Sequence, residues 1–125
     1  MLPQPVSAAL CRKGVLTVRD FEREALMLLC ASSLEPSQLH AAMNHPVATS
    51  CEFTGAGYYL ELAHPDLPEG HQVCSEPMVQ GVWRDQDVGF VAFITDSVLC
   101  LECYSYGNKG ISESIRDEVV RVFAT

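Results

Sequence analysis

Apolar side chains recur at every second position over a long stretch that begins near residue 47. The segment 47–54 alternates in this way, and the alternation resumes over 58–62 after an interruption that contains Gly55 and Gly57. A period of two is typical of a strand with one buried face, because successive side chains point to opposite sides of the backbone. The interruption predicts a turn or a bulge between two strands.

Three further segments predict strands. The runs 88–95 and 98–105 are rich in β-branched and aromatic residues, and the Asp-Ser pair between them indicates a tight hairpin. The segment 74–83 predicts an edge strand, because Pro77 has no N–H to donate to a neighbouring strand. The sequence therefore predicts about five antiparallel strands.

The two ends of the chain have helical patterns instead. Thr17, with Asp20 three residues later, predicts the start of an amphipathic helix that continues to about Ser32. The segment 35–46 predicts a second, short helix with one proline in its first turn and another that stops it. The segment 112–123, with a serine cap and apolar residues along one side, predicts a third helix.

Helices that precede and follow the strands, rather than alternating with them, indicate an α+β fold. We expect two N-terminal helices, an antiparallel sheet of about five strands, and a C-terminal helix packed on one face. A length of 125 residues with 48% hydrophobic side chains is enough for one core and excludes intrinsic disorder. The chain is therefore expected to form a single domain over 1–125, with 1–14 as a loosely ordered arm.

The six cysteines are expected to be reduced thiols. The longest strongly apolar run, 25–31, is too short to cross a bilayer, and the first residues lack the pattern of a secretory signal. The sequence therefore predicts a cytoplasmic protein with no membrane association, and cytoplasmic cysteines are seldom paired in disulfides. Cys30, Cys51 and Cys100 fall on helix or strand faces that we expect to be buried.

The net charge of −8 is concentrated in the part of the chain that predicts the sheet. Over 51–107, nine carboxylates accompany a single base, Arg84, whereas the segments before and after are balanced. A chain with this charge repels phosphate backbones, which argues against direct nucleic-acid binding. Two interpretations of the acidic segment stay open: ordinary solvation of a small protein, and an electrostatic docking face for a basic partner.

Cys100 and Cys103 have the C-x-x-C spacing of a redox pair or of half a zinc site. Residues three apart in a strand point to opposite faces, so we expect two structural cysteines. A metal site made by His64, His71 and Cys74 is an alternative, although that spacing matches no particular metal motif. No signature of a catalytic nucleophile is present, so neither a catalytic site nor a cofactor is expected.

The segments 54–59 (TGAGYY) and 89–107 (GFVAFITDSVLCLECYSYG) resemble a group of small uncharacterised bacterial cytoplasmic proteins. Those proteins carry a TGxGff segment followed by GFlLFI-DG-L-xLExYSYG. The resemblance covers roughly residues 50–112, and Ser97 departs from it because the pattern has glycine there. It implies a bacterial protein built on a sheet, and it transfers no catalytic residue. In size and acidity the chain also resembles the immunity proteins that neutralise bacterial toxins.

We therefore expect a non-enzymatic binding protein, an immunity protein that covers the cationic active site of a nuclease-type toxin domain. The expected contacts are six carboxylates of the sheet region and three tyrosine anchors: Glu52, Glu61, Glu76, Asp85, Asp87, Glu102, Tyr58, Tyr104 and Tyr106. One alternative is a small-molecule or thiol/metal-binding protein that uses the cysteines and histidines named above. The other is a homodimeric accessory subunit in which the edge 74–83 pairs with its twin.

Overall fold

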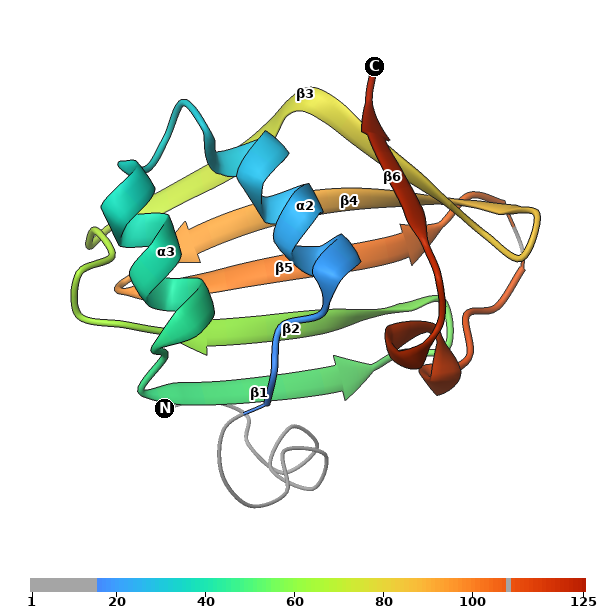
Figure 1. The fold of residues 1–125 in the computed structure, drawn as a ribbon, viewed down its shortest axis with the longest axis horizontal. Coiled ribbons are helices and arrows are strands. Elements are labelled where there is room, and N and C mark those ends of the chain that lie inside the picture. Colours follow the sequence, from blue (N-terminus) through green and yellow to red (C-terminus); the bar gives the residue numbers. More distant parts are fainter. Residues whose placement is uncertain (1–15, 108) are drawn as a thin grey trace.

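Two helices lie across one face of a six-stranded antiparallel sheet, and no described residue forms an element on the opposite face (Figure 1). The structure is a computed structural model that describes residues 16–107 and 109–125. The helices are α2 (Asp20–Cys30) and α3 (Pro36–Asn44). The strands are β1 (Ala48–Phe53), β2 (Gly57–Ala63), β3 (His71–Trp83), β4 (Gln86–Thr95), β5 (Val98–Ser105) and β6 (Arg121–Ala124), and a short 3-10 helix, η1 (Glu113–Asp117), precedes β6.

The strands lie in the order β1-β2-β5-β4-β3-β6 across the sheet. β3, β4 and β5 form a meander, and β2 pairs with the free side of β5. Asp96 and Ser97 between β4 and β5 have φ values of 47° and 70°, and Arg84 and Asp85 between β3 and β4 have 52° and 63°. Positive φ at both central residues is the mark of a type I′ turn, whose twist suits a two-residue hairpin. The predicted hairpin at Asp96 is therefore confirmed.

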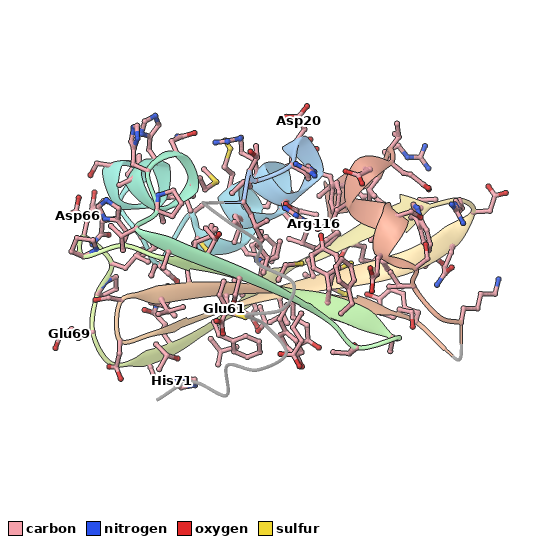
Figure 2. All side chains as sticks on the ribbon, turned by 90° about the horizontal axis from the view of Figure 1, so that it is seen from below. Asp20, Glu61, Asp66, Glu69, His71 and Arg116 are labelled. Atoms are coloured by element: carbon pink, nitrogen blue, oxygen red, sulfur yellow. The ribbon has the colours of Figure 1, made fainter. Side chains whose placement is uncertain are left out.

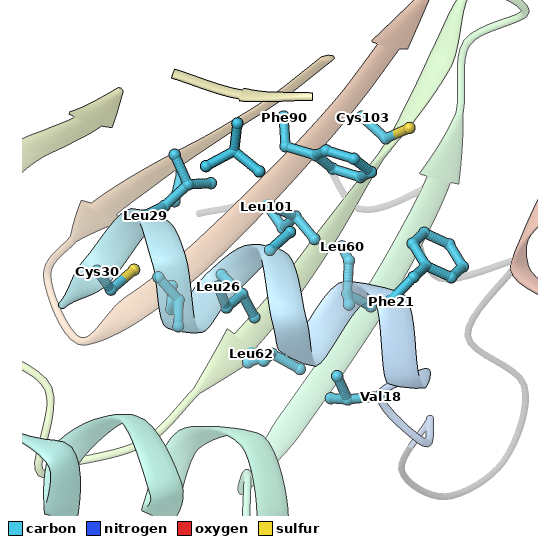
Figure 3. Close-up of a cluster of buried hydrophobic side chains, with 14 of the residues drawn as sticks. Val18, Phe21, Leu26, Leu29, Cys30, Leu60, Leu62, Phe90, Leu101 and Cys103 are labelled. Atoms are coloured by element: carbon cyan, nitrogen blue, oxygen red, sulfur yellow. The ribbon is translucent and has the colours of Figure 1, made fainter. Parts of the chain in front are cut away.

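The core lies between α2 and the sheet. Leu26 and Leu29 of α2 are buried among side chains of the sheet strands (Figure 3). Leu60, Leu101 and Ala92 are paired in register across β2, β5 and β4, and all three are fully buried. The alternation in the sequence therefore defines the face that meets the helices, and burial of this apolar surface is the main term that favours folding.

The start of α2 differs from the prediction. The helix begins at Asp20, so Thr17 is not its cap. Arg19 precedes the helix in an extended conformation, and its backbone N–H donates a hydrogen bond to Glu22 Oε1 at 2.8 Å. A glutamate three residues into a helix that accepts this bond satisfies one of the otherwise unpaired groups at the helix start. α3 begins at Pro36, as predicted.

The predicted C-terminal helix over 112–123 is wrong. That segment forms η1 and then β6, which pairs with residues 79–82 of β3. Val119, Val120 and Val122 are β-branched, and the edge of β3 offers backbone hydrogen bonds that a helix would leave unused. The sheet therefore has six strands instead of about five, and β3 is not an edge strand where β6 covers it. A homodimer formed through the whole edge 74–83 is incompatible with this pairing.

The five cysteines within the described residues are free thiols. Cys30, Cys51, Cys74 and Cys103 are buried, whereas Cys100 is half-buried on the side of the sheet away from the helices. The expectation of a core position for Cys100 is therefore corrected. The sixth cysteine and the expected arm over 1–14 lie outside the described residues. Within 16–107 and 109–125, no helix is long and apolar enough to cross a membrane.

Candidate functional site

The face of the sheet that points away from α2 and α3, here called the open face, carries the second set of alternating side chains. The strand register places Glu61, Cys100, Phe93 and Val73 side by side in one row across β2, β5, β4 and β3. Val73 is 49% exposed, and the other three are half-buried. A row that mixes a carboxylate with aromatic and aliphatic groups differs from the uniformly apolar face beneath the helices.

Three carboxylates lie on adjoining strands of the open face. Glu52 of β1 and Glu102 of β5 are both paired in register with Tyr59 of β2, one on each side. Glu61 lies two residues further along β2 and accepts a hydrogen bond from the Ser50 hydroxyl at 3.0 Å. All three acids are half-buried. Their charges therefore act through a medium of lower effective dielectric constant than bulk water.

This arrangement raises the pKa of two neighbouring groups. Burial, with the charges of Glu61 and Glu102, raises the pKa of the Cys100 thiol to about 12. Burial and the adjacent Glu102 also raise the pKa of the Tyr59 hydroxyl. Both groups are therefore protonated at neutral pH, and Cys100 is a poor nucleophile because the thiolate is the reactive form. Cys103, three residues on, lies in the core, so the C-x-x-C spacing does not bring two thiols together.

Much of the positive charge of the described residues is held on the helix side. Figure 2 shows Arg116 on that side of the sheet and Glu61 on the opposite side. Three arginines form ion pairs with carboxylates there: Arg19 with Asp117, Arg84 with Glu118, and Arg116 with Glu22. The register of β6 places Arg121 on the open face, next to Val82. The carboxylates of β1, β2 and β5 are several strands away from that arginine.

An aromatic corner lies beside the acids. A Cβ at Gly89 would overlap the Tyr104 ring, so this ring lies directly on the glycine backbone. Tyr106 meets Tyr104 edge to face, with ring centroids 5.7 Å apart, and is 38% exposed. The third predicted anchor is in a different place. Tyr58 is 1% exposed in the core and its hydroxyl donates to Glu22 at 2.6 Å, so it cannot contact a partner.

A groove of about 830 Å³ opens on the open face where β3 separates from β4. The register shifts between the pairs Cys74–Ala92 and Val79–Phe90, so four residues of β3 oppose Val91 alone. Two of the predicted contact carboxylates, Glu76 and Glu102, line this groove together with Tyr104. The two remaining ones, Asp85 and Asp87, are exposed in the β3–β4 turn and just after it.

The alternative metal ligands do not come together. The His64 Nδ1 accepts a hydrogen bond from the backbone N–H of Asp66, and His71 is exposed with its Nδ1 2.9 Å from Thr95 Oγ1. Cys74 is 3% exposed in the core. Within the part of the chain that the structure describes, no three His, Cys, Asp or Glu side chains form a group that could hold a metal ion. The geometry therefore gives the thiol/metal alternative no support.

A buried ion pair that no sequence pattern predicted lies on the helix side. Glu22 is fully buried and accepts hydrogen bonds from Arg116 Nε at 2.7 Å and from Arg116 Nη2 at 2.8 Å. Arg116 Nη2 also donates to the Thr17 carbonyl, and Arg19 Nε donates to the Arg116 carbonyl. Glu22 follows Val18 by four residues, on the apolar stripe of α2. A charge on that stripe is the one sequence signal that points to a buried partner.

Comparison of the chain with protein-family models, with curated proteins and with solved structures gives no match. The open face is accordingly interpreted from its own geometry and charge.

Proposed function

We propose that the protein is a non-enzymatic binding protein of the immunity type, which neutralises a basic, nuclease-type toxin domain through its open face. The observation that carries the proposal is the composition of this face. Half-buried carboxylates on β1, β2 and β5 lie beside an aromatic corner and exposed aliphatic groups. Protein-binding surfaces combine tyrosine and apolar contact area with charges that select the sign of the partner.

The sign of the charge favours a cationic partner. A domain that cleaves nucleic acid needs a positively charged cleft, because its substrate carries a negative charge on every phosphate. Glu52 and Glu102 lie on either side of Tyr59, two strand spacings of about 4.8 Å apart, and Glu61 is offset from both along β2. Carboxylates spread in this way can occupy such a cleft in place of phosphates. Occupation of the cleft excludes the substrate without any chemical step in the inhibitor.

The backbone geometry makes the open face a suitable rigid platform. Glu61 and Glu102 project from β2 and β5, strands with neighbours on both sides, and the Tyr104 ring lies over Gly89 and packs against Tyr106. Side chains that are ordered before binding lose less conformational entropy when a partner arrives. The helix side does not present a comparable set of carboxylates and tyrosines, because Arg19, Arg84 and Arg116 form ion pairs with carboxylates there.

The test begins with capture of partners on the immobilised protein from cells of its source, followed by purification of any captured cationic domain. Binding to that domain is then compared between the wild type and the double variant Glu61→Lys/Asp87→Lys. We expect the reversal to weaken binding at least a hundredfold, on the order of 3 kcal/mol, if the two acids pair with desolvated bases. We also expect the association rate to fall steeply as salt is raised.

The matched control is Glu24→Lys/Glu113→Lys, which changes the net charge equally at exposed positions outside the open face. We expect it to change affinity only a few-fold, through the long-range field. The captured domain should also lose its nuclease activity when the wild type is added in equal amount. Binding that is insensitive to both salt and the open-face reversal would contradict the proposal, and so would a bound domain that remains active.

A further inference from the structure

The break in the pairing of β3 and β4 creates a recess in an otherwise flat face. Residues 75–78 arch away from β4 between the two registers, and the arch is visible at the top of the sheet in Figure 1. β6 pairs with β3 over 79–82, and the Thr125 N–H donates to the Met78 carbonyl just beyond it. Residues 75–77 therefore have β4 on one side and no strand of the described residues on the other. The groove of about 830 Å³ described above occupies the space that regular pairing would have filled.

The walls of this groove are apolar over most of their length. Val91, Pro77 and Met78 line it, and Met78 is 52% exposed although it is a large apolar side chain. Phe90, which is buried, also contributes to its lining. The Tyr104 ring, which lies over the backbone of Gly89, supplies a flat aromatic wall. A long, unbranched side chain of a partner can make more contacts in a recess of this kind than on a flat surface.

The groove also has a charge of one sign. Glu102 rises from β5 and Glu76 from β3, and both line the groove, whereas no lysine, arginine or histidine of the described residues does so. Glu102 is half-buried next to the Tyr59 hydroxyl. A carboxylate has about four lone-pair sites, so one phenolic neighbour leaves acceptors for a further donor.

We propose that this groove is the anchor subsite of the open face and that it receives one arginine side chain from the cationic partner. The inference rests on the proposed function, which supplies a cationic partner. The aliphatic stem of the arginine lies between Met78 and Val91, its guanidinium stacks on Tyr104, and its N–H groups donate to Glu102. Arginine suits this site better than lysine because a planar, weakly hydrated cation both stacks on an aromatic ring and donates two parallel hydrogen bonds to a carboxylate.

The probe for the test is an acetylated and amidated octapeptide in which arginine and valine alternate, titrated into the full-length protein with labelled methyl groups. We expect the largest NMR shifts at the methyl groups of Met78 and Val91. A second peptide, with citrulline in place of every arginine, keeps the shape and loses the charge, and we expect it to bind at least tenfold more weakly. A lysine-valine peptide should bind several-fold more weakly than the arginine peptide.

Variants of the protein locate the site. We expect Glu102→Gln to weaken binding of the arginine peptide at least tenfold. The comparison variant Glu61→Gln removes a half-buried carboxylate from the same face but outside the groove, and should weaken binding clearly less than Glu102→Gln does. Tyr104→Leu, which keeps an apolar wall and removes the aromatic face, should reduce the preference for arginine over lysine. Chemical-shift maps of each free variant establish that it is folded.

Several outcomes would overturn the groove as an anchor. The first is an equal loss of affinity for the arginine peptide in Glu102→Gln and Glu61→Gln. The second is that the citrulline peptide binds as tightly as the arginine peptide, and the third is that no peptide binds at millimolar concentration. The fourth is that the chain self-associates in sedimentation measurements and that a second copy occupies the groove. In the first of these cases the open face still attracts a cationic partner, so the proposed function stands while the anchor fails. In the reverse case the arginine peptide binds in the groove, but no captured nuclease-type domain depends on the open face. The groove then stands as an arginine site, and the proposed function fails.

Discussion

Arg116 meets Glu22 through two hydrogen bonds in the interior, although 94 residues separate them in the chain. The arginine side chain is 8% exposed and the glutamate 0%. The carboxylate also accepts from the Tyr58 hydroxyl and from the Arg19 backbone N–H, so all its partners are polar groups of the protein. This network joins α2, β2 and η1 in one place, and its removal tests how the C-terminal segment is held.

We expect Arg116→Met to destabilise the protein by about 3–5 kcal/mol, because it leaves Glu22 as an uncompensated buried charge. Glu22→Gln/Arg116→Met should be more stable than Arg116→Met alone, since the amide carries no charge. Urea unfolding measures the free energies, and Asp117→Asn, which breaks the exposed pair with Arg19, should cost less than about 1 kcal/mol. Equal stability of the wild type and Arg116→Met would show that the buried pair does not hold the fold.

The pH dependence of stability should include a contribution from Glu118. Hydrogen bonds from Arg84 and from the Trp83 indole lower the pKa of this carboxyl from 4.5 to about 2 in the folded state. A depressed pKa stabilises the fold above the unfolded value of about 4.5, and the stabilisation is lost as the pH falls toward 2.

The measurement compares the free energies of unfolding of the wild type and Glu118→Gln between pH 6 and pH 2. The wild type should be the more stable above pH 4.5, and the difference should shrink as the pH falls. Trp83 is the only tryptophan in the chain, so its fluorescence reports directly on this contact. A difference that is constant over this range would mean that the ionised form of Glu118 has no special role.

Gly89→Ala should displace the Tyr104 ring. The new methyl group would overlap the far end of the Tyr104 ring, and moving this half-buried side chain away from its preferred rotamer costs on the order of 0.5–1.5 kcal/mol. The double variant Gly89→Ala/Tyr104→Ala removes the clash, so the alanine at 89 should cost much less in that background. Thermal or urea unfolding of the four proteins completes the cycle, and strictly additive effects would contradict the close contact.

All six cysteines should be reduced in the purified protein. Titration of the denatured but unreduced protein should return six thiols, and a deficit of two or more would contradict this expectation. In the native state at pH 8, alkylation should be slow at the buried cysteines because they are inaccessible. It should also be slow at Cys100, because a pKa of about 12 leaves little thiolate. Peptide mass spectrometry separates the individual positions.

The parts of the fold that the sequence predicted are those with local signals. The alternation over 47–62 and the Asp96-Ser97 turn determine strands and a hairpin through neighbouring residues alone, and the structure confirms them. The failure at 112–123 has a different origin. Its apolar residues fit a helical spacing, but the backbone edge of β3 was open to a strand, and only the assembled sheet could reveal that edge.

The candidate site was predicted in charge but not in arrangement. The carboxylates of 51–107 stood out in the composition, and alternation correctly assigned Glu52 and Glu61 to the face opposite the buried residues. The same alternation places Tyr58 on the buried face with Leu60 and Leu62, so the prediction of Tyr58 as a partner contact disagreed with the pattern. The groove depends on a register shift between two strands, and no local pattern reports how many residues oppose one another across a sheet.

The pairing of β2 with β5 determines what happens when the chain is cleaved between β2 and β3. The exposed segment at Glu69 and Gly70 separates a first part, α2 to β2, from a second part, β3 to β6. Neither part contains a complete core, yet the whole β2–β5 ladder and the Glu22–Arg116 pair span the two. We therefore expect that, after cleavage at this segment, neither fragment folds without the other.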